Sequence, residues 1–244
     1  MDPARAAALH LALGLPGPPP GAGDPLPPFF HQAHFWTPAR PGDLGADGHP
    51  RQGLGPIPAT GLPRRMWAGG RLRFHAPLRA GRPAERITVL ERLERKEGRS
   101  GPLAFVTLRH EIAQGGAPRV TEWQDLVYRG PGPAAAPPAA PDWPEVARHG
   151  TDPVLLFRYS ALTGNGHRIH YDAEYARGAE GYAGLVVHGP LLAQWTMLAA
   201  GPMDGFAFRA RAPMTCGGEV RVLRDGRRLA AVSDAGLHME GEVL

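Results

Sequence analysis

The segment from Tyr159 to Asp172 holds the densest group of polar side chains in the sequence. Asn165, His167, His170 and Asp172 lie within eight consecutive positions, and neighbouring glycines allow the backbone to turn sharply. Histidine is the side chain whose ordinary pKa, about 6.5, suits proton transfer near neutral pH. The segment therefore predicts acid–base chemistry.

A second chemical feature, the start of a predicted helix, follows 19 residues after His170. Pro190 stands where the first helical residue should lie, which is the favoured place for proline, and the helix is expected to end at Ala200. Because proline has no N–H, Gly189 and Leu191 are expected to present the amides of the first turn. Such amides stabilise a developing oxyanion. A histidine beside them suits chemistry next to a thioester carbonyl, where the enolate oxygen becomes negative.

The elements that must position these residues fall into two halves, and the first half reads as an antiparallel meander. An aromatic cluster at 29–36 predicts a helix or turn that plugs a core, and a long loop follows to residue 63. A turn is expected from Gly98 to Gly101. Apart from a short helix over 4–13, the expected elements are strands at 71–76, 85–95, 103–113 and 119–129.

The second half combines helices with another meander. An apolar run covers 154–159, a short helix is expected from about Asp172, and the helix over 190–200 follows. Asp225-Gly226 predicts a two-residue hairpin between the later strands. Between the halves, residues 130–144 are rich in proline and alanine and predict a linker. We therefore expect an α+β chain with a first half over 1–129 and a second half over 145–244.

Composition restricts the partners. The net charge is +4 and Lys96 is the only lysine, and the arginines are scattered among acidic residues instead of forming a basic patch, so we expect no nucleic-acid binding. Cys216 is the only cysteine, so no intrachain disulfide can form, which suits a cytoplasmic location. No apolar run approaches the roughly 20 residues that a membrane span needs, so no membrane association is expected.

These motifs resemble the MaoC-like hydratases and dehydratases. The likeness lies in Gly164-Asn165, in His170 five residues after Asn165, and in His188-Gly189 at the start of the later helix. Asn165 stands where the common motif has Asp, as in a subgroup that comprises type-2 3-hydroxyacyl-thioester dehydratases and mesaconyl-CoA and itaconyl-CoA hydratases. Segments of the first half resemble the same subgroup, namely 35–38, 47–51, 62–70 and 124–129.

The resemblance implies a fold and an activity. The fold is a double hot dog, with two antiparallel sheets each wrapped on a central helix, a first half without catalytic residues and a second half that carries the site. The activity is reversible addition of water to the α,β-double bond of an enoyl-CoA thioester, either of the mesaconyl-CoA or itaconyl-CoA kind or as a 3-hydroxyacyl-CoA dehydratase. Coenzyme A is part of the substrate, no cofactor is expected, and open sheet edges favour a homodimer.

We assign roles within this framework. His170 is the expected acid/base, Asn165 orients the water because an amide cannot accept its proton, and Gly189 donates to the oxyanion. The residues expected at the substrate are His167, Arg168, Leu191, Arg64 and Arg65. Each has a structural alternative: His170 as a core histidine, Asn165 as a turn residue, Gly189 as part of the helix start, and the arginines as solvated side chains. Asp172 is expected to cap the helix that follows it.

Two other functions remain open at this stage. The same fold supports thioester hydrolysis, for which Asn165 is a less natural residue than a carboxylate. Asn165 also motivates a non-catalytic module that binds acyl thioesters. His167, His170 and Asp172 have a spacing that occurs in metal sites, but no further ligands accompany them, so we expect no metal.

Overall fold

The computed structural model describes residues 1–98, 101–132 and 135–244. The middle of the predicted 98–101 turn and part of the predicted linker therefore lie outside the described residues. Within the described residues, the strands form one antiparallel sheet of nine strands in the order β2-β3-β4-β1-β6-β9-β8-β7-β5. Their bounds are β1 Arg64–Phe74, β2 Glu85–Gly98, β3 Gly101–Gln114, β4 Ala117–Arg129, β5 Glu145–Gly150, β6 Gly205–Ala210, β7 Glu219–Asp225, β8 Arg228–Ser233 and β9 Gly236–Val243.

The predicted strands of the first half are confirmed, with the first one starting at residue 64 and not at 71. The two halves are joined where β1 pairs with β6, from Gly69 opposite Arg209 to Arg73 opposite Gly205. A Cβ on Gly69 would lie 2.6 Å from the Phe208 carbonyl oxygen. This glycine therefore permits the close approach that merges the two expected sheets into one continuous sheet.

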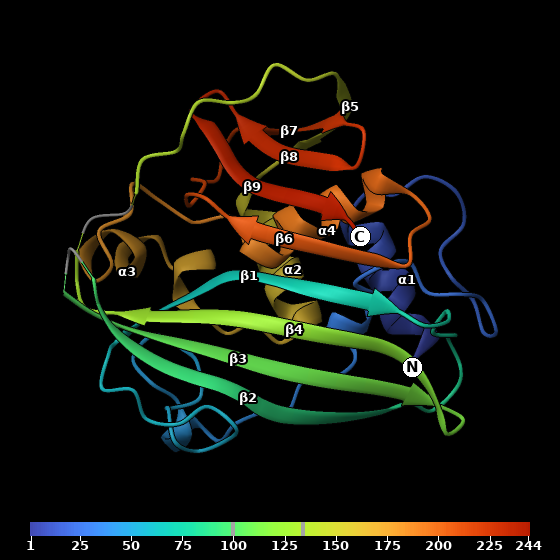
Figure 1. Cartoon of the computed structure of the whole chain (residues 1–244), viewed down its shortest axis with the longest axis horizontal. Coiled ribbons are helices and arrows are strands. Elements are labelled where there is room, and N and C mark those ends of the chain that lie inside the picture. Colours follow the sequence, from blue (N-terminus) through green and yellow to red (C-terminus); the bar gives the residue numbers. More distant parts are fainter. Residues whose placement is uncertain (99–100, 133–134) are drawn as a thin grey trace.

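The long helices lie together behind one face of the sheet (Figure 1). In the second half, α4 packs against β6 to β9 and also contacts β1, and most of its side chains are buried. The first half has no comparable helix on its strands among the described residues. There the short 3₁₀ turn η1 packs on the sheet, while α1 packs against α2 and η1. The helices are α1 Pro3–Ala12, α2 Pro153–Thr163, α3 Ala173–Gly178 and α4 Gly189–Ala200, with 3₁₀ turns η1 Phe30–Ala33, η2 Pro41–Asp43 and η3 Arg168–His170.

Local chemistry sets the ends of these helices. Asp152 accepts a hydrogen bond from the Leu155 amide at 2.7 Å and so caps α2, the helix formed by the apolar run that the sequence shows after residue 153. Asp172 caps α3 in the same way through the Tyr175 amide at 2.9 Å, which confirms the prediction for that residue. The hairpin between β7 and β8 has its turn one residue later than predicted, with Asp225 opposite Arg228.

One hydrophobic core runs through both halves. Phe29 and Phe30, which precede and begin η1, are fully buried, as expected for the aromatic cluster. Phe29 contacts Trp67 of β1 and Phe208 of β6, so it lies where the two halves join. Its cluster continues to Trp195 of α4. The sheet and α4 therefore form a shared frame on which the segment between α2 and α4 is fixed. No helix among the described residues is long and apolar enough to span a membrane.

Candidate active site

The predicted catalytic segment is a tight loop between α2 and α3. Gly164 ends α2 with φ of 65°, and a Cβ on it would lie 2.5 Å from the Trp36 side chain. A Cβ on Gly166 would lie 2.7 Å from the Gly48 carbonyl oxygen. The two glycines therefore allow segments of the first half to pack directly on this loop.

Asn165 fixes the conformation of the loop and faces a cavity. Its Oδ1 accepts a hydrogen bond from the His167 amide at 3.1 Å. The buried His167 ring donates through Nε2 to the Glu180 carboxylate at 2.9 Å. Asn165 and His167 both line the cavity. Asn165 therefore combines the predicted site position with the turn role that was its alternative.

His170 is buried and presents one unprotonated nitrogen. Its Nδ1 lies 2.7 Å from the Val186 carbonyl oxygen, which can only accept, so Nδ1 carries the proton and Nε2 is a free acceptor. Burial, with smaller contributions from His167 and His49, lowers the pKa of His170 to about 3 against the opposing effect of the Val186 carbonyl. At neutral pH this ring is a neutral base.

His188 packs against the ring of His170. The two rings are stacked, with centroids 3.6 Å apart. The Ser160 hydroxyl on α2 lies 2.8 Å from His188 Nε2 in a fully buried contact. Burial holds the pKa of His188 well below its ordinary value. Two elements, α2 and the start of α4, therefore fix the plane of the His170 ring.

The start of α4 leaves one of the two predicted amide donors without a partner in the described part of the chain, and its oxyanion role stays a prediction. Gly189 lines the cavity, and its N–H donates to no other group in the described part of the chain. The Leu191 amide already donates to the His188 carbonyl oxygen at 3.1 Å, and its side chain is fully buried away from the cavity lining. The prediction for Leu191 is therefore wrong, because the first turn of α4 closes on His188.

The cavity has a volume of about 830 Å³ and is lined by both halves of the chain. The second half contributes Asn165, His167, His170 and Gly189. Lining residues from the first half include Gln32, His49, Arg65, Trp67, Arg86 and Gln124. The first half thus supplies much of the wall of the site, which no pattern in the sequence indicated.

Only one of the predicted arginines reaches this cavity. Arg65 lines it, and no carboxylate lies within ion-pair distance of Arg65 among the described residues. Arg64 is not among the lining residues and donates to the carbonyl of Gly132, which does line the cavity. Arg168 is bound to Asp172 at 2.7 Å and to the Ala46 carbonyl at 3.0 Å. Protein groups therefore bind both Arg64 and Arg168, and their substrate contacts stay a prediction.

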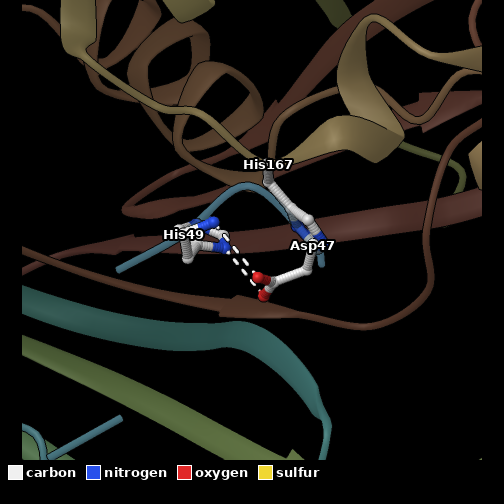
Figure 2. A group of neighbouring side chains, drawn as sticks. All are labelled: Asp47, His49 and His167. Carbon is white, nitrogen blue, oxygen red and sulfur yellow. Dashed lines mark hydrogen bonds and ion pairs between the residues drawn. The ribbon is translucent and has the colours of Figure 1, made fainter. Parts of the chain in front are cut away.

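A pair that sequence reasoning did not assign lies beside His167. His49 Nδ1 is 3.2 Å from the Asp47 carboxylate, and its ring centroid is 4.6 Å from that of His167 (Figure 2). Burial, together with Arg65, lowers the pKa of His49 to about 4 despite the opposite effect of Asp47. Burial acts to raise the pKa of Asp47, but hydrogen bonds from His49 outweigh it and hold that pKa below its ordinary value. The spacing of Asp47 and His49, two residues apart in a long loop, was the sequence pattern that could have indicated this pair.

Potential ligand atoms of Asp47, His49 and His167 all lie within 4.8 Å of one another, close enough to share a cation. Each of these residues already has a partner in the protein, because Asp47 binds His49 and His167 binds Glu180. The metal-site spacing considered in the sequence was that of His167, His170 and Asp172. Asp172 does not join the two histidines, because it caps α3 and pairs with Arg168. We therefore treat the three residues as a hydrogen-bonded cluster.

A neutral histidine, an amide side chain and a free amide at the start of the central helix, in a cavity under a hot-dog sheet, are features of the MaoC-like class. The model of the hydroxyacyl-thioester dehydratase type 2 family matches residues 29–216, and the chain belongs to that family. It is 48% identical over 221 residues to the mesaconyl-C(4)-CoA hydratase of Chloroflexus aurantiacus, with 86% of this chain and 79% of that protein covered.

Solved structures share the fold at low sequence identity. HtdX of Mycobacterium tuberculosis superposes with a TM-score of 0.72 at 18% identity, covering 100% of this chain and 95% of that one. A MaoC-like dehydratase from Phytophthora capsici gives a TM-score of 0.63 at 15% identity, covering 100% and 93%. The double hot-dog fold and the hydratase/dehydratase class predicted from the sequence are thus confirmed.

Proposed function

We propose that the chain adds water reversibly to the α,β-double bond of a short enoyl-CoA thioester, with a branched dicarboxyl acyl group of the mesaconyl-CoA or itaconyl-CoA kind favoured. The observation that carries this proposal is His170, whose unprotonated Nε2 belongs to a buried ring in the same cavity as the free Gly189 amide. The similarity to a mesaconyl-C(4)-CoA hydratase supports the acyl group.

The reaction uses the site residues in separate roles. The thioester oxygen accepts the Gly189 N–H, which stabilises the enolate. Asn165 and His170 hold the water, and His170 Nε2 removes its proton as the oxygen attacks the β-carbon. The proton is then returned to the α-carbon. Because a catalyst lowers the same barrier in both directions, these residues also catalyse the dehydration of a 3-hydroxyacyl thioester.

Arg65 is the residue we assign to an anionic group of the substrate. It lines the cavity, it has no acidic partner in the described residues, and it lies close enough to His49 to lower that pKa. A guanidinium without a partner suits a carboxylate or a phosphate. A dicarboxyl acyl-CoA offers both groups and an acyl-CoA with an uncharged chain offers the phosphates alone, so Arg65 is compatible with both substrate classes.

We also propose that no metal or other cofactor takes part, that the protein acts in the cytoplasm, and that two chains pair as a homodimer. The pairing proposal rests on the edge strand β2, which carries exposed apolar side chains at Ile87, Val89, Leu90 and Leu93. No basic patch that suggests nucleic-acid binding was recognised in the sequence.

The test is a spectrophotometric assay with mesaconyl-C(4)-CoA, itaconyl-CoA and crotonyl-CoA, with thiol release followed in parallel. We expect loss of the conjugated-thioester absorbance without thiol release, and a rate lowered about 10²-fold or more in His170→Ala. His75→Ala, which changes an exposed histidine outside the cavity, is the matched control. Thiol release would identify a thioesterase instead, and full activity in His170→Ala would contradict the assigned base.

A further inference from the structure

Three histidines in the cavity are held in the same manner, each with one nitrogen bonded to an acceptor. His170 Nδ1 donates to the Val186 carbonyl, His167 Nε2 to Glu180 and His49 Nδ1 to Asp47. Because burial lowers the pKa of His170 and of His49, the other nitrogen of each of these two rings is left as an acceptor. The three rings follow one another, with centroids 5.6 Å apart for His167 and His170 and 4.6 Å apart for His49 and His167.

His170 is poorly suited to keep a proton once it has removed it from water. Its anchor is a neutral carbonyl, and its ring neighbours His188 and His167 bring no negative charge of their own. A buried imidazolium that has no carboxylate bound to its own ring is disfavoured, and the carboxylates of this cluster are bound to His167 and His49. The residue that common members of the family place at position 165 is an acid, whereas Asn165 cannot accept a proton.

His49 has the partner that His170 lacks. Asp47 accepts from both the ring and the backbone amide of His49, at 3.2 Å and 3.1 Å, so the carboxylate fixes the tautomer and stabilises the protonated ring. His49 lines the cavity shared with His170, and its side chain retains 16% of its surface exposed. The groups that face it are Asp47, Arg65 and His167.

We propose that His49, supported by Asp47, is a second catalytic residue of the hydration, and that it carries the proton between water and the α-carbon. This inference rests on the proposed function. It also assigns a catalytic role to the first half, which the sequence predicted to be non-catalytic.

The step balances with the groups in the cavity. The oxygen of water bonds to the β-carbon, the π pair of the double bond moves onto the thioester oxygen, and the water proton passes to His170 Nε2. That proton moves to His49 Nε2, where the Asp47 carboxylate offsets its charge. His49 then gives it to the α-carbon as the enolate pair forms the C–H bond. Both histidines end neutral, and one molecule of water has been added.

The test compares His49→Ala, His49→Gln and Asp47→Asn with wild type on the best substrate of the panel. We expect kcat to fall about 10²-fold or more for both His49 variants and less for Asp47→Asn, with KM little changed. Added imidazole is expected to restore part of the rate to His49→Ala, since it supplies the missing base in the space left by the ring. Asp43→Asn, in the same loop but exposed, is the matched control and keeps the wild-type rate.

Several outcomes separate the two proposals. If wild type hydrates no enoyl-CoA, the proposed function fails before the inference is reached. If wild type is active and His49→Gln keeps its kcat, the inference is overturned. A loss of rate that imidazole does not restore, accompanied by a lower unfolding temperature, would show a structural role and also overturn it. Full activity in His49→Ala combined with loss in His167→Ala would assign the proton to the His167–Glu180 pair instead.

Discussion

At the scale of single residues, the site depends on histidines that burial keeps neutral. His170 is the clearest case, because its Nδ1 is bound to the Val186 carbonyl and its pKa is lowered to about 3. A buried neutral imidazole is a base over a wide pH range, whereas an exposed one would be half protonated near pH 6.5. The residue type and spacing predicted His170 and Asn165 as site residues, but the sequence could not show that His170 is anchored by a carbonyl 16 positions away.

The pH dependence of hydration follows from this pKa. His170 and His49 both act when unprotonated, so kcat/KM is expected to stay level from pH 8 down to about pH 5 and to fall as the pH approaches their pKa values, about 4 for His49 and about 3 for His170. Initial rates over this range measure the pH dependence. As a control for irreversible unfolding, samples held at each pH are returned to pH 7 and assayed again. An acid limb centred near pH 6.5 would contradict a buried neutral base.

At the scale of elements, α2 and α4 act together on the catalytic ring through Ser160 and His188. Ser160→Ala leaves His188 Nε2 buried without its partner at 2.8 Å. We expect a loss of about 1–3 kcal/mol in the free energy of unfolding and a reduced hydration rate, because the ring stacked on His170 is no longer fixed. Chemical denaturation measures the first and the enoyl-CoA assay the second. Thr88→Ala, which removes a partly buried hydroxyl–histidine contact with His110 outside the cavity lining, is the matched comparison for activity.

The loop of the first half that packs on the catalytic loop provides another test. Gly48 has φ of 87°, and a Cβ there would lie 2.1 Å from the Gly166 carbonyl oxygen. Gly48→Ala is therefore expected to displace the catalytic loop and to lower the rate at least tenfold. Gly42→Ala has nothing within 4 Å of the new Cβ and is expected to keep wild-type activity. Equal activity in both variants would contradict this contact.

The elements show where sequence reasoning was sufficient. The periodicity of apolar residues and the residues that cap helices predicted α3, α4 and most strands, because both patterns are local in the sequence. The joining of two sheets into one depends on Gly69 lying against Phe208, and the placement of Asp47 and His49 beside His167 depends on a long irregular loop. Neither contact leaves a periodic pattern. The contact of Arg168 with the Ala46 carbonyl was missed for the same reason, since Ala46 is distant in the chain.

At the scale of the whole molecule, several buried histidines couple stability to pH. Burial lowers the pKa of His49 to about 4 and that of His170 to about 3, below the value of about 6.5 in an unfolded chain. The unfolded state therefore binds more protons below pH 6.5, and stability falls as the pH drops from there toward the folded pKa values. We expect a loss of up to about 1.4 kcal/mol per pH unit for each such histidine. Denaturant titrations measure the free energy of unfolding at each pH. A value that stays constant from pH 7 to pH 5 would contradict this expectation.

The edge strand β2 sets the expectation for assembly. Ile87 is 61% exposed and lies with Val89, Leu90 and Leu93 on this edge. We expect wild type to sediment as a dimer and Ile87→Lys to shift it toward the monomer, because a charge on an edge strand opposes pairing. Sedimentation velocity at several concentrations is the measurement. A monomeric wild type, or a dimer that Ile87→Lys does not weaken, would contradict pairing through this edge.

The central claim is that this site adds water across a carbon–carbon double bond, and the most direct test is the mass of the product. Wild type is incubated with mesaconyl-C(4)-CoA in H₂¹⁸O, and the CoA thioesters are analysed by mass spectrometry. We expect an intact thioester that has gained one molecule of water with the ¹⁸O on the acyl chain, and no gain with His170→Ala. Free coenzyme A together with ¹⁸O in a released acid would show hydrolysis, and an unchanged substrate would contradict the assignment.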